Sequence, residues 1–322
     1  MSALPPIATA KTDSRKGACL LYPRKRTFGL APRGWASVSF LLFGADGASV
    51  SDFKAFGDLE RAGWSDPERA SGYVELFATA SDQAIGSLLD AVKAKPKLKA
   101  LDLCCGQGSV SEALANRGCD VIGVDFSPAM LTRADARVSN AVFIRADAQE
   151  LPFGDHEFDI VVSNLGVCHV PDQPRALSEA RRVLRRGGRF AMTVWCGPDV
   201  SPCFEIVYGA IKAHGSREVS APPGPDFHQF ARRDVADNLL REAGFHEVDL
   251  TIVDCAWDLE SPDGLSEIYE KGTVRAAMVL ARQPPQNLTA IRVAMAQAVQ
   301  KRFACGDRWR VPVPAALVWA TA

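Results

Sequence analysis

Two glycines and three aspartates stand where a chain of alternating strands and helices would hold a polar ligand. Gly106 and Gly108 follow a short apolar run, at a point where a strand is expected to give way to a helix. Such a turn lets bare backbone approach a ligand and presents the unpaired N–H groups of a helix N-terminus. Asp102 precedes the glycines, while Asp125 and Asp147 follow at intervals of 23 and 22 residues. The spacing predicts three carboxylates at three successive strand ends.

The position of Asp102 separates two classes of ligand. A dinucleotide site favours G-x-G-x-x-G, but Ser111 occupies the third glycine position here. A carboxylate beside the turn repels a pyrophosphate and attracts a cation. S-adenosylmethionine (SAM) carries a sulfonium and an ammonium group, so Asp102 suits its amino-acid end. We expect Asp125 to accept hydrogen bonds from the ribose hydroxyls and Asp147 to accept one from the adenine amino group.

The elements that must position these residues alternate along the chain. Short apolar runs of β type alternate with stretches of helical period, which predicts parallel strands joined by right-handed crossovers, with helices on both faces of a sheet. Ser127 followed by Pro128 is typical of a helix start, and Gly118 and the pair Gly187-Gly188 are typical of helix ends. The expected strands are 100–103, 121–124, 142–144, 160–163 and 190–194, and the expected helices are 109–117, 128–137 and 174–185.

Segments outside this core complete the expected sheet. Helical spacing predicts two helices within 66–93, and a further helix at 234–243 leads to a strand at 248–253. A mostly helical stretch at 261–304 separates that strand from the apolar segment 315–320. We therefore expect the stretch to be an insertion between the last two strands of one sheet.

The first 50 residues differ in composition from the rest. Residues 1–36 hold seven Lys or Arg and a single Asp, and prolines interrupt any amphipathic period. We expect a disordered or extraneous segment, with translation from near Val50 as one explanation. The prediction is thus one domain over 51–322, with a ligand-binding core at about 98–196 and helical lid segments at about 200–233 and 261–308.

Five segments together resemble the successive motifs of class I SAM-dependent methyltransferases. They are LDLCCGQG at 101–108, VDFS at 124–127, ADAQELPF at 146–153, FDIVV at 158–162 and LRRGG at 184–188. The resemblance is closest to the branch of ubiquinone/menaquinone-biosynthesis and other small-molecule methyltransferases. It implies an α/β fold, a Rossmann-like doubly wound seven-stranded sheet whose last strand is antiparallel, with helical lid insertions. It further implies that SAM is bound by Asp102, Cys104, Gly106, Gly108, Asp125, Phe126, Asp147, Ala148 and Asn164.

One residue departs from the family pattern, and one is the candidate base. Cys104 stands where the first motif glycine of the family usually stands. The segment from Asn164 to His169 lies where the family lines the space beneath the transferable methyl, and it lacks the Asp/Asn-Pro-Pro-aromatic motif of amino-group methyltransferases. Methyl transfer requires in-line alignment and, for a hydroxyl nucleophile, removal of a proton. His169 is the candidate general base; the alternative is that it only supports the turn at Pro171.

Aromatic residues beyond the core have two interpretations. They form either a lid over an apolar acceptor or ordinary packing. The arginines at 181, 182, 185, 186 and 189 are interpreted as a solvated helix face. The aromatic candidates are Trp195, Phe227, Phe230, Trp257, Tyr269 and Trp309.

Composition narrows the class of protein. The 37 Lys plus Arg nearly balance the 38 Asp plus Glu, which disfavours nucleic acid as a partner. The nine scattered cysteines include no C-x-x-C pair, so we expect no metal site and a reducing cytoplasm. No apolar run is long enough to span a membrane. The sequence predicts a cytoplasmic enzyme that transfers methyl from SAM to oxygen, carbon or nitrogen of a small molecule; the alternatives are an NAD(P)-dependent oxidoreductase and a non-catalytic SAM-binding protein.

Overall fold

Seven strands form one mixed sheet in the order β3-β2-β1-β4-β5-β10-β6. The computed structural model describes residues 53–322, so the expectation for residues 1–50 falls outside the described part. Strands β1 to β5 are parallel, and β10 runs antiparallel to both of its neighbours. The expected seven-stranded sheet with an antiparallel last strand is confirmed. The strands are β1 (Lys99–Leu103), β2 (Asp120–Asp125), β3 (Val142–Arg145), β4 (Phe158–Asn164), β5 (Leu184–Trp195), β6 (His246–Val253) and β10 (Ala315–Thr321).

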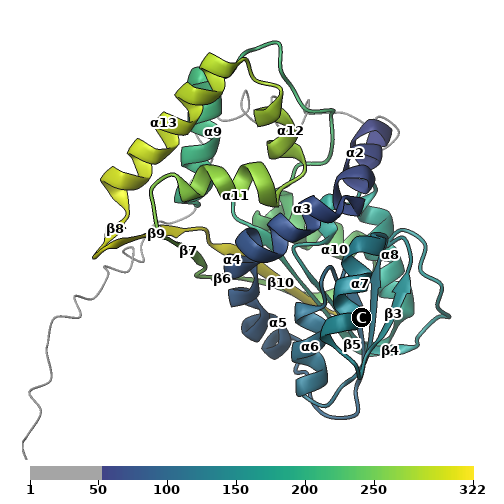
Figure 1. Ribbon diagram of the computed structural model, residues 1–322. Helices are drawn as coiled ribbons and strands as arrows, with labels where there is room; N and C mark the ends of the chain where they lie inside the picture. Colours follow the sequence, from purple (N-terminus) through teal and green to yellow (C-terminus); the bar gives the residue numbers. More distant parts are fainter. Residues whose placement is uncertain (1–52) are drawn as a thin grey trace, which may run out of the picture.

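Helices cover both faces of this sheet (Figure 1). Side chains of a strand alternate between its faces with a period of two, and β5 shows this directly. Phe190 and Met192 pack with the helices on one face, while Ala191 packs on the other. The first face is covered by α8 (Gln173–Val183) and α10 (Arg233–Glu242), the second by α5 (Ile85–Ala91) and α6 (Ser109–Asn116). Helix α7 (Pro128–Arg137) packs along β3 and starts at the Ser127 cap, as expected.

The expected end of α8 is wrong. The helix stops at Val183, and β5 begins at Leu184, so Gly187-Gly188 and the arginines from 185 onward lie in a strand. The reason is a main-chain pairing with the far end of the sequence. Gly187 N donates to Ala322 O at 2.8 Å, and Ala322 N donates to Gly188 O at 2.8 Å. Local helix-end signals carry no information about such a distant partner.

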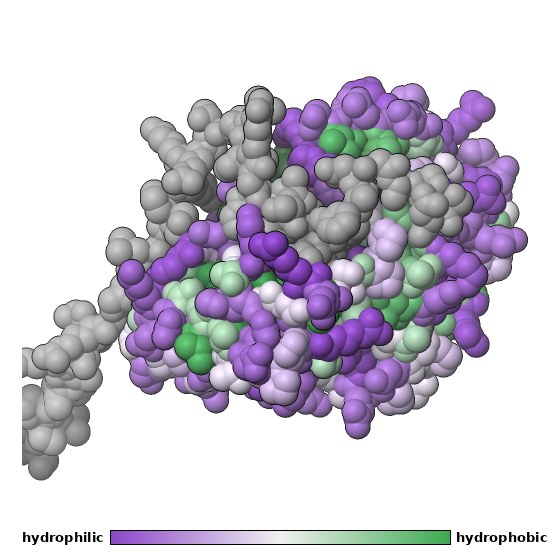
Figure 2. Space-filling view, turned by 90° about the horizontal axis from the view of Figure 1, so that it is seen from above, coloured by the Kyte–Doolittle hydropathy of each residue, from purple (hydrophilic) through white to green (hydrophobic). Residues whose placement is uncertain are grey.

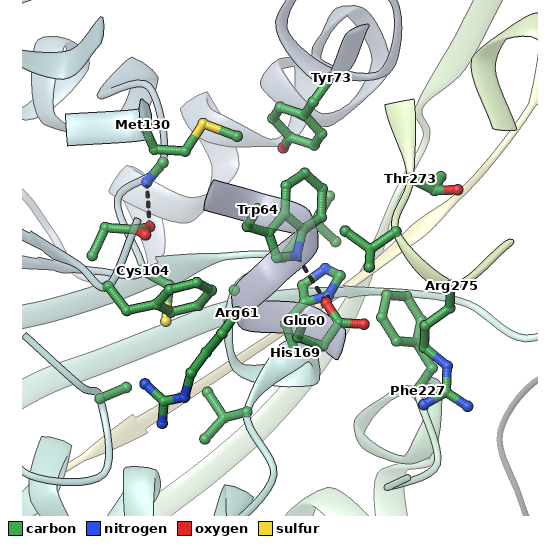
Figure 3. Close-up of a pocket in the computed structure, with 18 of the residues that line it drawn as sticks. Glu60, Arg61, Trp64, Tyr73, Cys104, Met130, His169, Phe227, Thr273 and Arg275 are labelled. Atoms are coloured by element: carbon green, nitrogen blue, oxygen red, sulfur yellow. Dashed lines mark hydrogen bonds and ion pairs between the residues drawn. The ribbon is translucent and has the colours of Figure 1, made fainter. Parts of the chain in front are cut away.

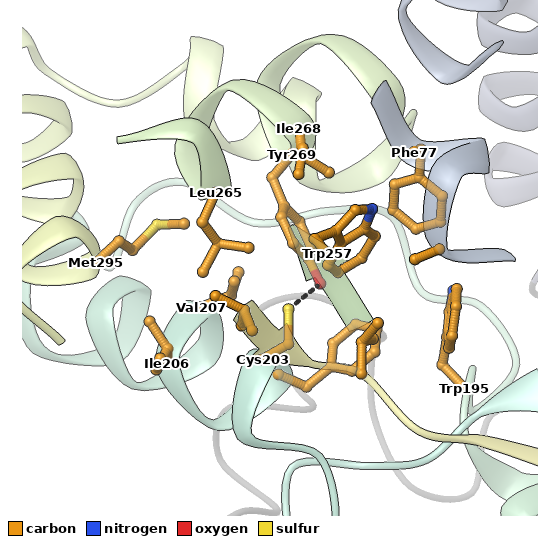
Figure 4. Packing of buried hydrophobic residues seen from close by; sticks show 14 of the residues in the cluster. Phe77, Trp195, Cys203, Ile206, Val207, Trp257, Leu265, Ile268, Tyr269 and Met295 are labelled. Carbon is orange, nitrogen blue, oxygen red and sulfur yellow. Dashed lines mark hydrogen bonds between the residues drawn. The ribbon is translucent and has the colours of Figure 1, made fainter. Parts of the chain in front are cut away.

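The chain between β6 and β10 forms a second layer of structure, which confirms the expected helical insertion. Together with α9 (Pro202–His214) it builds the group of helices at the upper left of Figure 1. Their core is strongly aromatic: Trp257 and Tyr269 pack edge to face, and Tyr269 Oη lies 3.3 Å from Cys203 Sγ (Figure 4). A small antiparallel sheet, β7-β9-β8, was not expected from the sequence. The elements are β7 (Ala256–Leu259), α11 (Gly264–Gly272), α12 (Arg275–Ala281), α13 (Pro285–Arg302), β8 (Ala304–Cys305) and β9 (Arg308–Pro312).

The helical segment before β1 is more broken than two regular helices. It contains α2 (Lys54–Ser65), α3 (Pro67–Gly72), a π-helical turn η2 (Tyr73–Phe77), α4 (Ala78–Ser81) and a 3-10 turn η3 (Asp82–Ala84) before α5. Isolated π turns often occur at functional sites. In Figure 1, α2 and α3 lie between the sheet layer and the insertion. This placement brings α2 over the carboxyl edge of the sheet.

The described part of the chain contains no helix that is both long enough and apolar enough to cross a membrane. Seen from above, the surface is mostly hydrophilic, with smaller hydrophobic areas set among the polar side chains (Figure 2).

Candidate active site

A large cavity opens at the carboxyl edge of the parallel strands. It encloses about 1380 Å³, counting the open space at its mouth. Several parts of the chain line it. The strand ends contribute Cys104, Gly106, Asp125, Phe126, Asp147, Ala148, Asn164, His169 and Trp195. Helix α2 contributes Gly57, Glu60, Arg61 and Trp64, and the π turn contributes Tyr73 and Phe77. The second layer contributes Phe204, Tyr208, Tyr269, Thr273 and Arg275, and the loop after α9 contributes Phe227.

The turn after β1 has left-handed backbone at both predicted glycines. Gly106 has φ 52° and Gly108 has φ 81°, a region that glycine adopts without strain. A Cβ added at Gly106 would meet no atom within 4 Å, so the backbone there borders open space. Gly108 instead caps α6 and lies against Ala134, where an added Cβ would approach to 3.1 Å. Of the two glycines, only Gly106 lines the cavity.

Asp125 ties the glycine turn to the end of β2. Its Oδ2 accepts a hydrogen bond from Gly106 N at 3.0 Å, and its Oδ1 accepts one from Ser127 N at 2.8 Å. Burial raises the pKa of this carboxyl, and the hydrogen bonds oppose that rise. The carboxylate is therefore fixed in position at the cavity wall with lone pairs remaining for a ligand.

Asp102 faces a second, smaller cavity that adjoins the first. Tyr73, Cys104, Gly106 and Asn164 line both cavities and so mark their junction. Asp102 is 1 % exposed; its Oδ2 accepts from Ser111 Oγ at 2.7 Å, while its Oδ1 has no partner among the described residues. Burial raises the pKa of Asp102 to about 7. A buried carboxylate oxygen without a hydrogen-bond donor is costly to the fold.

Asp147 lies at the opposite end of the large cavity from Asp102. Its Oδ2 pairs with Arg61 Nη2 at 2.7 Å, and its Oδ1 accepts from both the backbone and the side chain of Gln149. Burial alone would raise its pKa, but these hydrogen bonds outweigh burial and lower it. The Arg61 guanidinium also lies 5.9 Å from the ring centre of Phe126. Helix α2 thus reaches across this end of the cavity.

Cys104 adopts a glycine-like conformation, with φ 58°. Its side chain occupies space that the neighbouring Gly166 leaves open: a Cβ at Gly166 would lie 2.4 Å from Cys104 Cβ. The side chain at position 104 therefore fits only because residue 166 has no side chain. Cys104 is half-buried, and its removal from water raises the pKa of the thiol well above the usual value, which makes it a poor nucleophile.

The segment after β4 holds Asn164 and His169 at the cavity wall. Asn164 Nδ2 donates to Ser81 O at 3.2 Å, and its Oδ1 accepts from Thr193 Oγ1 at 2.5 Å. His169 Nδ1 lies 2.8 Å from Glu60 Oε2 on α2, an ion pair between segments 109 residues apart. Both residues line the cavity, and the sequence did not predict the partner of His169.

The surroundings of His169 favour its protonated form. Burial lowers the pKa of the imidazole, but the Cys168 side chain and the Glu60 carboxylate together outweigh burial and raise it to about 10. A histidine that already carries its proton donates hydrogen bonds and cannot remove a proton from an acceptor. The base role of His169 stays a prediction.

Aromatic side chains from the end of β5, the loop after α9 and the second layer close the cavity. Among the aromatic candidates from the sequence, Trp195, Phe227 and Tyr269 line the cavity, whereas Phe230, Trp257 and Trp309 do not. The Phe227 ring packs edge to face on His169, with ring centres 5.1 Å apart. The aromatic wall therefore stands beside the Glu60–His169 pair, opposite the acidic strand ends.

Sequence reasoning missed the contribution of the N-terminal helices. Glu60, Arg61 and Trp64 on α2 and Tyr73 on the π turn line the cavity, yet none belongs to a recognised motif. The only available signal was the buried helical pattern of this region, which does not distinguish a site from a core. Arg275 was also missed; its Nη2 donates to Pro222 O at 3.0 Å, and its guanidinium stacks on Phe56.

The sheet order and the cavity at its carboxyl edge together define a class I methyltransferase fold. A solved structure from Anabaena variabilis, described as a methyltransferase from an antibiotic biosynthesis pathway, shares this fold with a TM-score of 0.51 and 17 % sequence identity. The alignment covers 74 % of the present chain and 96 % of the Anabaena chain.

Sequence comparison supplies the family. A model described as a methyltransferase domain matches residues 101–192. Demethylmenaquinone methyltransferase of Beutenbergia cavernae is 36 % identical over 170 residues, which cover 50 % of this chain and 70 % of the relative. The enzyme of the same name from Staphylococcus carnosus is 32 % identical over 181 residues, covering 51 % and 74 %. The chain belongs to the class I SAM-dependent methyltransferases, and its relatives include demethylmenaquinone methyltransferases.

Proposed function

We propose that this protein binds SAM across the two adjoining cavities and transfers its methyl group to a small-molecule acceptor with an apolar, ring-containing body. One observation carries the proposal. The acidic and glycine-rich strand ends share a single cavity with an aromatic wall, so two ligands of different chemistry fit end to end. Oxygen, carbon and nitrogen remain the candidate nucleophiles.

The residues present suit SAM. The unpartnered Oδ1 of Asp102 suits its ammonium group, and Asp125 has lone pairs for the ribose hydroxyls. The open space at Gly106 admits close approach of the ligand to the backbone. Phe126, Asp147 and Ala148 would border the adenine, while Cys104 and Asn164, at the junction of the cavities, would border the sulfonium. When bound, SAM supplies an electrophilic methyl group on a positively charged sulfur.

The acceptor is proposed to lie against the aromatic wall. Phe204, Tyr208, Phe227 and Tyr269 offer broad apolar surfaces that suit a flat ring. The relatives named demethylmenaquinone methyltransferases support an acceptor of quinol type, although they match only about half of this chain. Helices α9, α11, α12 and α13 then act as a lid that excludes water from the reacting groups.

The chain's own residues perform three tasks in this proposal. The acids and the glycine turn fix the donor end, the aromatic wall orients the acceptor, and closure by α2 and the second layer lowers the local dielectric. All eight cysteines in the described part are unpaired, which supports the proposal of a reducing cytoplasm.

Calorimetry and a labelling screen test the proposal. The protein is titrated with SAM and, separately, with NADH, and is then incubated with methyl-labelled SAM and a metabolite extract. Binding of SAM but not NADH, with label transferred to a small molecule, is the expected result. Binding of NADH in place of SAM would support an oxidoreductase. SAM binding without any labelled product would support a non-catalytic SAM-binding protein.

A further inference from the structure

The side chain of Glu60 is an ionisable group at the acceptor end of the cavity to which no motif draws attention. It lies on α2 and is 1 % exposed. Its Oε2 accepts two hydrogen bonds at 2.8 Å, one from Trp64 Nε1 and one from His169 Nδ1. Figure 3 shows Glu60 held between the indole and the imidazole, with Phe227 and Arg275 on the far side. Two donors from different elements thus fix this carboxylate in one orientation.

The other oxygen, Glu60 Oε1, is buried and has no hydrogen-bond partner among the described residues. Glu60 is one of the residues that line the large cavity, so a ligand in that cavity lies next to this side chain. A buried carboxylate oxygen without a hydrogen-bond donor destabilises the fold by more free energy than most single side-chain contacts contribute. Both the orientation and the missing partner are explained if a bound molecule donates a hydrogen bond to Oε1.

We propose that Glu60 is the catalytic base, and that the acceptor carries a hydroxyl group that donates its hydrogen bond to Glu60 Oε1. This inference rests on the proposed methyl transfer from SAM. The acceptor O–H bond breaks and its proton moves to Oε1. The electron pair left on oxygen forms the bond to the methyl carbon directly. In a conjugated acceptor a ring carbon forms that bond instead; the ring carbon then loses its own proton to water, and the oxygen takes back the proton held by Glu60. The methyl–sulfur bond breaks, and its electron pair returns to sulfur to give neutral S-adenosylhomocysteine.

The charges favour this assignment. The reaction begins with a carboxylate and a sulfonium and ends with a neutral acid and a neutral thioether. Loss of opposite charges is favoured where water is excluded, because neither charge is well solvated there. His169, protonated and bonded to Oε2, acts as a positioning residue for the carboxylate. An ammonium-bearing acceptor would add a second cation beside this imidazolium, so the site favours a hydroxyl.

Turnover of a matched pair of variants tests the role of Glu60. Glu60→Gln keeps the shape and both hydrogen bonds to Oε2 but cannot accept a proton. With the labelled extract, we expect the rate of methyl transfer at saturating SAM to fall by about 10²–10⁴-fold, which is the usual contribution of general base catalysis. The KM for SAM should change less than about threefold. Asp58→Asn, an exposed carboxylate on the same helix, is the control and should retain wild-type turnover. Affinity for SAM should be unchanged in both variants. The melting temperature should be unchanged in Asp58→Asn and lower in Glu60→Gln, which loses the charge that pairs with His169 but should stay folded at the assay temperature.

Binding of a hydroxylated probe tests the hydrogen bond without turnover. Naphthol and its methyl ether, methoxynaphthalene, are titrated into the protein saturated with S-adenosylhomocysteine. We expect the wild type to prefer naphthol by about tenfold, and Glu60→Ala, checked by circular dichroism to be folded at the assay temperature, to lose that preference.

The outcomes distinguish this inference from the proposed function. If wild type binds no SAM, the proposed function fails. If wild type binds SAM but shows no naphthol preference, or if Glu60→Gln keeps full turnover, the assignment of Glu60 is overturned and the methyltransferase proposal stands. If His169→Gln abolishes turnover while Glu60→Gln does not, the base is His169. Partial activity in His169→Gln, whose amide can still donate toward Glu60, agrees with a positioning role.

Discussion

Replacement of Asp102 by Asn should stabilise the free protein and weaken SAM binding at the same time. Asp102 is almost fully buried and has one unpartnered carboxylate oxygen. Its pKa is about 7 in the folded protein, compared with an ordinary value of 3.8. The folded protein therefore binds more protons at this group than the unfolded chain does. Its contribution to stability is fully present below about pH 4 and is lost as the pH rises through about 7.

The size of the effect follows from that pKa difference. At 1.36 kcal/mol per pH unit, the raised pKa of Asp102 destabilises the fold by about 4 kcal/mol at pH 8, where the folded group is ionised. At pH 5, where the group is protonated in the fold but ionised in the unfolded chain, it destabilises the fold by about 2 kcal/mol. The amide introduced by Asp102→Asn avoids this cost. It leaves one N–H group without a partner, which reduces the gain in unfolding free energy by roughly 1–3 kcal/mol. We expect a net gain of about 2 kcal/mol at pH 8, or roughly 4–8 °C in melting temperature.

Thermal unfolding and SAM titration across pH 5–8 measure both effects. Asp102 must ionise to attract the SAM ammonium group, so wild-type Kd should rise roughly fivefold between pH 7 and pH 6. Asp102→Asn should bind SAM more weakly and without this pH dependence. Asp120→Asn, an exposed carboxylate at the start of β2, serves as the control. A melting temperature of Asp102→Asn below wild type at pH 8, or a wild-type Kd independent of pH, would refute the reasoning.

Two further predictions concern the residues after β4. Gly166→Ala should destabilise the protein by about 1–3 kcal/mol, because the added Cβ would lie 2.4 Å from Cys104 Cβ. Adding Cys104→Gly should restore most of the lost stability. Additive losses in a double-mutant cycle of melting temperatures would contradict this prediction. Burial lowers the pKa of His169, but Cys168 and Glu60 raise it to about 10, so its contribution to stability is full below pH 6.5 and is lost as the pH rises through 10. Nitrogen NMR of the labelled His169 imidazole should show both ring nitrogens protonated at pH 7.5. A neutral imidazole at that pH would contradict the prediction.

Much of the fold was predictable because its signals are local. The strand and helix periods between β1 and α7 depend on neighbouring residues, as does the Ser127-Pro128 helix start. The acids at 102, 125 and 147 could be placed at one edge because parallel strands end on the same side of a sheet. The end of α8 could not be placed, because the Gly187 and Gly188 backbone pairs with Ala322 at the far end of the chain.

The sheet, its glycine turn and the acidic strand ends could be inferred from the sequence, because they follow from short-range spacing. What faces them became visible only in the folded chain. Helix α2 folds back over the sheet so that Glu60 meets His169, 109 positions away, and Phe227 from the loop after α9 packs against the same imidazole. Such contacts depend on how hydrophobic faces of distant segments pack together, and no pattern within either segment records which partner it will meet.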